Sequence, residues 1–153
     1  MAEHAPDSPA PQAESLVTPV VYELPLKVTE DDIDARGHAN NVVYLRWVQE
    51  AATAHWRAGA TARQQEDYAW VVARHEIDYL ASALAGDDLV ARTWVGEAAG
   101  ARFERFVEIW RPQDDRLLAR ARSVWVALDG RTGRPRRVDS DLQRRFHAPR
   151  AGV

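Results

Sequence analysis

Residues 32–47 read Asp-Ile-Asp-Ala-Arg-Gly-His-Ala-Asn-Asn-Val-Val-Tyr-Leu-Arg-Trp, and no other stretch of the chain is as informative. Carboxylates, an imidazole and two amides are crowded into a loop that runs directly into a segment with apolar residues at helical spacing. The first N–H groups of a helix lack partners within the helix and carry a partial positive charge. A helix that begins here would place the carboxylate of Asp34 beside donors able to polarise an oxygen atom.

The order of these residues resembles the D-x-D-x-x-G-H-x-N-N-x-x-Y pattern of the hotdog-fold acyl thioesterases. The similar families are the 4-hydroxybenzoyl-CoA thioesterase-like acyl-CoA hydrolases and the plant acyl-carrier-protein thioesterases. The likeness covers roughly residues 19–146, because the turns at Ala85-Gly86-Asp87 and Thr132-Gly133-Arg134-Pro135 also fall where those families have theirs. The resemblance implies a homo-oligomer, a homodimer or a dimer of dimers (homotetramer), with the substrate bound across the junction of two subunits.

Hydrophobic periodicity predicts an α+β domain, in which a curled antiparallel sheet of five to six strands wraps a long central helix. The resemblance implies that this domain is a hotdog fold. Apolar residues on nearly every side of the helix predict that most of it is buried, and Gly59 is a reasonable stop. Pro25 places the first strand at a sheet edge or bulge. A polar connection is expected over residues 61–67. The expected strands are 20–28, 69–79, 88–98, 102–111 and 117–129, and the expected helices are 42–58 and 140–146.

Composition favours one ordinary domain. The chain has 153 residues, a net charge of −3 and no cysteine, which argues against nucleic acid as a partner and removes thiol nucleophiles and disulfides. We expect a disordered, proline-containing leader over residues 1–18, a hotdog thioesterase domain over 19–147 and a flexible tail over 148–153. No apolar run is long enough for a signal peptide or a membrane span. These features fit a cytoplasmic enzyme with no membrane partner.

Asp34 is the candidate catalytic carboxylate, since the resemblance places the acid of the family's motif at this second aspartate. It would act as a general base on water or as a nucleophile on a thioester carbonyl. The alternative is an aspartate that only caps the helix. The resemblance also makes the N–H of Asn41 the main donor to the substrate oxygen. His38 would assist by orienting the carboxylate, bonding the thioester oxygen or moving a proton, although a structural histidine is the alternative.

Four further residues of the loop and first helical turn are candidates for substrate binding: Arg36, Gly37, Asn40 and Tyr44. The plant carrier-protein enzymes have an asparagine where this chain has Arg36. Its guanidinium could keep Asp34 ionised or reach a phosphate of the substrate. Glu50, further along the helix, is a weaker candidate for a catalytic carboxylate.

No cofactor and no metal ion are expected, although carboxylates and an imidazole at this spacing could in principle hold a divalent cation. The C-terminal arginines are either a solvated basic segment or contacts for the phosphates of coenzyme A; they are Arg131, Arg134, Arg136, Arg137, Arg144, Arg145 and Arg150. On the expected strands, four apolar residues are candidates for the outer face of the sheet and for a dimer contact: Phe106, Trp110, Val124 and Val126.

The function that this sequence predicts is an acyl-CoA thioesterase, a hydrolase that converts an acyl thioester to a free acid and coenzyme A. Two alternatives stay open. One is the same hydrolysis on an acyl carrier protein. The other is a non-catalytic protein that binds acyl thioesters or fatty acids. Serine-hydrolase chemistry lacks support, because no serine lies in a G-x-S-x-G turn.

Overall fold

The computed structural model describes residues 17–149. In chain order the elements are β1 Val17–Pro19, β2 Tyr22–Lys27, α1 Asn41–Gly59, α2 Ala62–Asp67, β3 Tyr68–Tyr79, β4 Asp88–Ala99, β5 Arg102–Arg111, β6 Arg116–Asp129, α3 Ser140–Arg145 and β7 His147–Pro149. The predicted leader and tail, residues 1–18 and 148–153, lie outside the described residues, apart from two residues of each that belong to β1 and β7.

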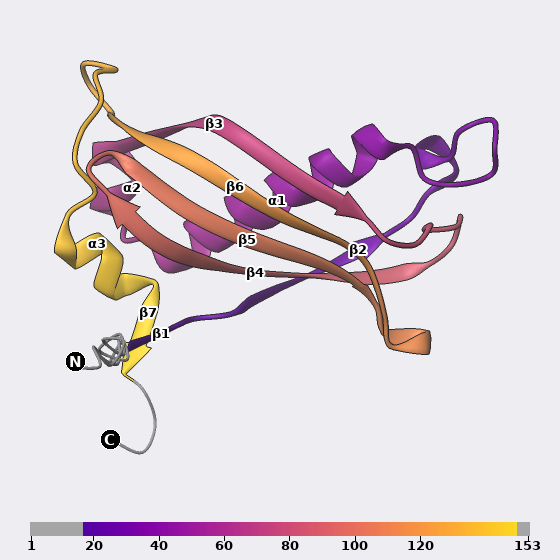
Figure 1. The fold of residues 1–153 in the computed structure, drawn as a ribbon. Helices are drawn as coiled ribbons and strands as arrows, with labels where there is room; N and C mark the ends of the chain where they lie inside the picture. Colours follow the sequence, from indigo (N-terminus) through magenta and orange to yellow (C-terminus); the bar gives the residue numbers. More distant parts are fainter. Residues whose placement is uncertain (1–16, 150–153) are drawn as a thin grey trace, which may run out of the picture.

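Five strands form one antiparallel sheet in the order β2-β4-β5-β6-β3, and β1 pairs with β7 in a separate two-stranded ribbon. The sheet curls, and α1 lies along one of its faces (Figure 1). This architecture is the predicted α+β hotdog fold. Because β2 is an edge strand, the missing N–H of Pro25 is tolerated there, as the sequence indicated.

The alternation on β5 decides which residues face α1. Phe103, Arg105, Val107 and Ile109 are all buried, while the residues between them are only partly buried. Strand residues alternate between the two faces of a sheet, so a charged side chain, Arg105, is carried into the interior together with apolar neighbours. The predicted sharing of one face by these four residues is confirmed.

Helix α1 begins at Asn41 because the side chain of Asn40 accepts a hydrogen bond from Val42 N at 3.0 Å and caps the first turn. One side of the helix packs on the sheet, and its buried residues are Val43, Tyr44, Trp47, Val48, Ala51, Ala52 and His55. The opposite side is open, and Val42 is 71% exposed. The expectation that the helix is buried on nearly every side was therefore wrong, because the sheet covers only one side.

The segment predicted as a polar connection contains a short helix, α2. Thr61 accepts a hydrogen bond from Gln64 N at 3.1 Å, and the Gln64 side chain accepts one from Thr61 N at 2.9 Å. This reciprocal capping box is a local signal for a helix start. The helix has no buried residue, so apolar periodicity gave no sign of it.

A second group of buried side chains lies at the C-terminal end of α1, where α3 packs against it. Phe146 is almost fully buried there. A Cβ atom on Gly59 would lie 2.5 Å from Phe146 Cε1, so Gly59 is needed for this close approach. The helix does end at Gly59, but Ala60 in an extended conformation makes the cap.

The outer face of the sheet is less exposed than the sequence suggested. Val124 is buried, and Phe106 stacks on Trp94 with ring centroids 5.8 Å apart. The guanidinium of Arg92 lies over the Trp110 ring. Among residues 19–147, the exposed large apolar side chains are Val20, Val21, Val42, Val71, Tyr79, Leu80 and Leu84. Of the strand residues among them, Val71 lies on the outer face, where it pairs with Val126.

Candidate active site

Asp32 builds the loop that precedes α1. Its side chain is only 3% exposed, and its Oδ2 atom accepts hydrogen bonds from Thr29 N at 2.9 Å and from Thr29 Oγ1 at 3.2 Å. Arg46, one turn into α1, donates to Asp32 Oδ1 at 2.7 Å. Burial alone would raise the pKa of Asp32, but the Thr29 hydrogen bonds and the Arg46 guanidinium together hold it below its usual value. Asp32 therefore ties the loop to the helix.

Asp34 sits at the start of a tight turn. Its Oδ1 atom accepts a hydrogen bond from Arg36 N at 2.9 Å, and its carbonyl accepts one from Gly37 N at 3.0 Å. Gly37 has a φ of +81°, which a residue with a Cβ rarely adopts. Within the part of the chain that the structure describes, Oδ2 of Asp34 accepts no hydrogen bond from a protein donor. One carboxylate oxygen thus fixes the turn, and the other has no protein hydrogen bond within the described residues.

A second loop, residues 80–83, lies against this turn. Ala39 N donates to Ala83 O at 2.9 Å, and the exposed His38 has its Nδ1 atom 3.4 Å from Ser82 Oγ. Tyr79, at the end of β3, donates its hydroxyl to Asn41 O at 3.3 Å. Two distant segments are therefore held around the first residue of α1.

Tyr44 holds the second loop in place. Its ring is almost fully buried, and its hydroxyl accepts from Ala83 N at 2.9 Å and donates to Ala81 O at 3.3 Å. Burial raises the pKa of Tyr44, with its hydrogen bond from Ala83 acting in the opposite direction. The hydroxyl is thus engaged by the backbone, and Tyr44 contributes a wall of the site.

These segments enclose an open cleft of about 290 Å³, lined by Asp34, Arg36, His38, Ala39, Asn41, Tyr44, Tyr79, Leu80, Ala81 and Ser82. Five of the seven predicted site residues are in that wall. Gly37 and Asn40 shape the turn and the helix start instead. Sequence reasoning missed Tyr79, Leu80 and Ser82, because no local pattern links residues 79–82 to a loop some forty positions earlier.

Arg36 is exposed and reaches Asp34 through its backbone N–H. The structure contains no ion pair between the Arg36 guanidinium and Asp34. No contact therefore supports the expectation that this charge keeps the carboxylate ionised. Glu50 forms an ion pair with Arg46 at 3.3 Å on the exposed side of α1. That pairing gives Glu50 a structural contact outside the cleft.

The C-terminal arginines are not gathered at the cleft. Arg136 lies over the Tyr68 ring, with its Cζ atom 3.9 Å from the ring centroid. Arg145 donates to Gly59 O at 2.6 Å, and Arg144 forms an ion pair with Asp141 within α3. Arg150 lies outside the described residues. Of these contacts, the hydrogen bond from Arg145 ties α3 to the C-terminal end of α1.

Among residues 17–149, no three side chains of His, Asp or Glu come close enough together to hold a metal ion. Within the same range, no helix is long and apolar enough to cross a bilayer.

Comparison with known proteins shows which family the chain belongs to. Residues 28–146 match the family model described as the thioesterase-like superfamily. The chain belongs to the thioesterase-like superfamily, and its enzyme class is thioester hydrolase, as the sequence predicted. A comparison with curated protein sequences gave no match.

Solved structures share the fold at low sequence identity. A 1,4-dihydroxy-2-naphthoyl-CoA thioesterase from Synechocystis is 22% identical, with a TM-score of 0.72 over 83% of this chain and 96% of that chain. A probable thioesterase from Escherichia coli is 21% identical, with a TM-score of 0.72 over 80% and 94%. A thioesterase from Thermus thermophilus, complexed with coenzyme A and zinc, is 24% identical, with a TM-score of 0.70 over 81% and 90%.

Proposed function

We propose that this chain hydrolyses an acyl-CoA thioester to the free acid and coenzyme A. One observation carries the proposal. Asp34 and Asn41, the first residue of α1, line the same cleft, and one oxygen of the Asp34 carboxylate has no protein donor within the described residues. A carboxylate beside the positive end of a helix supplies a base or nucleophile and an oxyanion donor, the two groups that promote attack on a carbonyl.

In this mechanism Asp34 Oδ2 takes a proton from water as the water oxygen bonds to the thioester carbon. The carbonyl oxygen becomes an oxyanion and accepts a hydrogen bond from Asn41 N–H. The C–S bond then breaks, and the sulfur leaves as a thiolate that takes up a proton. His38, which also lines the cleft, assists by bonding the oxyanion or by moving that proton. In the alternative course, Asp34 attacks directly and forms an anhydride that water then hydrolyses.

Coenzyme A as the thiol carrier is supported by the exposed Arg36 in the cleft wall, since a guanidinium suits phosphate oxygens. The Synechocystis protein is named as a CoA thioesterase, and the Thermus protein was solved with coenzyme A. These names describe the two neighbours, and an acyl-CoA substrate for this chain is consistent with both of them.

The test is release of free thiol from a panel of short, long and aromatic acyl-CoAs by the wild-type protein and by Asp34→Asn. We expect turnover of at least one thioester, and a fall in kcat of roughly 10²- to 10⁴-fold for Asp34→Asn, the range for a lost general base. Asp31→Asn, an exposed carboxylate in the same loop, is the matched control and should keep wild-type kcat. A folded Asp34→Asn protein that retains full turnover would contradict the assignment.

A single turnover in ¹⁸O-labelled water tests for the covalent course. Label in the Asp34 side chain identifies Asp34 as the nucleophile, because solvent oxygen enters that carboxylate only when water attacks the aspartyl carbon of the anhydride. Label in the acid alone is expected if Asp34 is a base, and it also results if water attacks the acyl carbon of the anhydride.

A further inference from the structure

A second cavity lies at the other end of α1. It encloses about 180 Å³, and Ala52, Thr53 and Trp56 supply its helix wall. The remaining lining residues are Trp70, Val95, Phe103, Glu104, Arg105, Trp125 and Phe146. At a rise of about 1.5 Å per residue, Ala52 is roughly 16 Å along the helix from Asn41, so this cavity is distinct from the cleft. An apolar cavity of roughly 150 Å³ holds benzene, so one ring or a short chain fits here.

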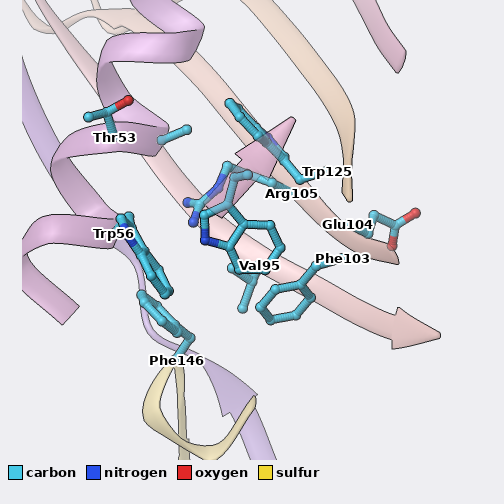
Figure 2. Close-up of a pocket in the computed structure, with 10 residues that line it drawn as sticks. Thr53, Trp56, Val95, Phe103, Glu104, Arg105, Trp125 and Phe146 are labelled. Carbon is cyan, nitrogen blue, oxygen red and sulfur yellow. The ribbon is translucent and has the colours of Figure 1, made fainter. Parts of the chain in front are cut away.

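Arg105 places a positive charge among the aromatic side chains that line this cavity. Its side chain is 7% exposed, and Figure 2 shows it reaching from the sheet toward the helix among the aromatic rings. Its Nη1 atom donates to His55 Nδ1 at 3.0 Å and to Thr93 Oγ1 at 2.9 Å. Burial, and to a lesser extent the Arg105 charge, lowers the pKa of His55 to about 4, so both acceptors are neutral at pH 7.

Among residues 17–149, no carboxylate balances this charge, because Arg105 forms no ion pair with an aspartate or glutamate there. The neighbouring Glu104 points away from it in Figure 2 and accepts a hydrogen bond from Arg122 Nε at 2.6 Å. Burial lowers the pKa of Arg105 to about 10, which still leaves it protonated at pH 7. A buried charge without a counter-ion is strongly unfavourable, so its presence needs an explanation.

The indole N–H groups of Trp70 and Trp125 are also without partners in the part of the chain that the structure describes. Both residues line the cavity, and both Nε1 atoms are buried with no hydrogen-bond acceptor among the described residues. Arg105, Trp70 and Trp125 are all donors. Glu104, the carboxylate among the lining residues, is paired with Arg122. Within the described residues these donors therefore lack an anionic acceptor, which is the kind of partner that the guanidinium favours.

We propose that this cavity binds the carboxylate of a small aromatic or aliphatic acid. Arg105 provides the counter-charge, the two indoles provide further donors, and the rings of Trp56 and Phe103 cover the apolar body. A carboxylate is planar, carries one charge and matches the fork of one guanidinium. A phosphate would bring up to two charges to a site with a single cation. The acid has two possible sources: the far end of an ω-carboxyacyl thioester, or a free acid such as a reaction product.

The binding test uses benzoate and hexanoate, each against its neutral amide, in calorimetric titrations of the full chain. We expect each acid to bind at least roughly 10-fold more tightly than its amide, and Arg105→Met to abolish that preference. Arg120→Met, an exposed arginine on the outer face of the same sheet, is the matched control and should keep it. Trp70→Phe keeps an aromatic ring but removes the N–H, and it should weaken acid binding several-fold, which tests the site even if Arg105→Met does not fold. Equal affinity for acid and amide, or no binding of either acid, would overturn the proposal.

A second experiment identifies the source of the bound acid, and it rests on the proposed function. Thiol release is measured for ω-carboxyacyl-CoAs of six to sixteen carbons, each against its uncharged counterpart. A higher kcat/KM for the charged member at one chain length, lost in Arg105→Met, identifies the acyl group as the ligand. Equal rates at every length, with acid binding intact, identify a free acid. If no thioester is hydrolysed, the proposed function fails while the binding result stands.

Discussion

His55 is a buried histidine whose surroundings hold it in the neutral form. It is 3% exposed, its ring stacks on Tyr22 and meets Phe146 edge-on, and its Nδ1 atom accepts from Arg105. A proton on this imidazole would have to enter a desolvated site beside a guanidinium. Folding therefore expels that proton.

The consequence is a stability that depends on pH. Because the pKa of His55 falls from 6.5 in the unfolded chain to about 4 in the fold, the unfolded state binds more protons between these values. This contribution is fully present above pH 6.5 and is lost as the pH falls toward 4, amounting to on the order of 3 kcal/mol. We expect the melting temperature to fall over this range, and to fall less steeply in His55→Gln. Thermal unfolding at intervals between pH 7 and pH 4 measures both slopes, and parallel slopes would contradict the prediction.

At the scale of single residues, the sequence predicted those site residues that lie in one continuous motif. Asp34, His38 and Asn41 share one short loop, and the structure places all three in one cleft. It did not predict Ser82, whose place beside His38 depends on how a distant loop folds back. The contact of His55 with Arg105 was equally hidden, because it joins one face of a helix to one face of a strand.

Helix α1 ties the fold to the site through its N-cap. Asn40 Oδ1 holds Val42 N, while Asn40 N donates to Asp32 O at 3.0 Å. Asn40→Ala should lower the free energy of unfolding by about 1 kcal/mol, the usual value of a lost cap. It should also lower kcat, because the adjacent Asn41 N–H loses its fixed direction. Denaturant unfolding and thiol release measure the two effects. Asn40→Asp keeps an acceptor and should restore most of both; an Asn40→Ala protein with unchanged stability would show that the cap is unimportant.

At the other end of α1, a substitution at Gly59 tests the packing against Phe146. Replacing glycine by alanine in a helix normally stabilises it. Gly59→Ala should do the opposite, by about 1–3 kcal/mol, because the new Cβ would meet the buried ring of Phe146. In a Phe146→Leu background the same substitution should become neutral or stabilising. Thermal unfolding of the four proteins in this cycle measures the coupling, and stabilisation in the wild-type background would contradict it.

Strands were the most predictable elements, because alternation and glycine or proline turns act locally. The range predicted for β5, 102–111, is the one observed, and the other long strands differ by a residue or two. Helix α2 was missed because it buries nothing. The register shift between Val72 and Arg74 also left no local sign, since it depends on pairing with β6.

At the scale of the whole molecule, β3 is an open edge of the sheet. Val71 on this strand is 48% exposed, and Tyr79 at its end and Leu80 just beyond it are similarly exposed. An unpaired edge with apolar side chains is a surface that a second copy of the chain could cover. We infer that the active unit is a homodimer, or a dimer of dimers, formed along β3.

Light scattering after size-exclusion chromatography should give a multiple of 17.2 kDa at micromolar concentration. Val71→Lys should shift the protein toward monomer and abolish hydrolysis, although Asp34 is untouched, because the substrate would lose one wall. Val21→Lys, an equally exposed valine just before the opposite edge strand, is the control and should keep both mass and activity. A wild-type protein that is a fully active monomer would refute the inferred dimer.

The strand order also determines when each strand finds its partner during synthesis. β3 leaves the ribosome before β4 and β5, yet among the described strands its only neighbour in the sheet is β6, which is made after both. Until residue 129 has emerged, β3 has no hydrogen-bonded strand on either side, and its inward residues Trp70, Val72 and Ile77 lack that neighbour. Unpaired apolar strands are the segments most prone to associate between nascent chains. The pace of translation between residues 80 and 129 therefore sets how long this chain is vulnerable to aggregation.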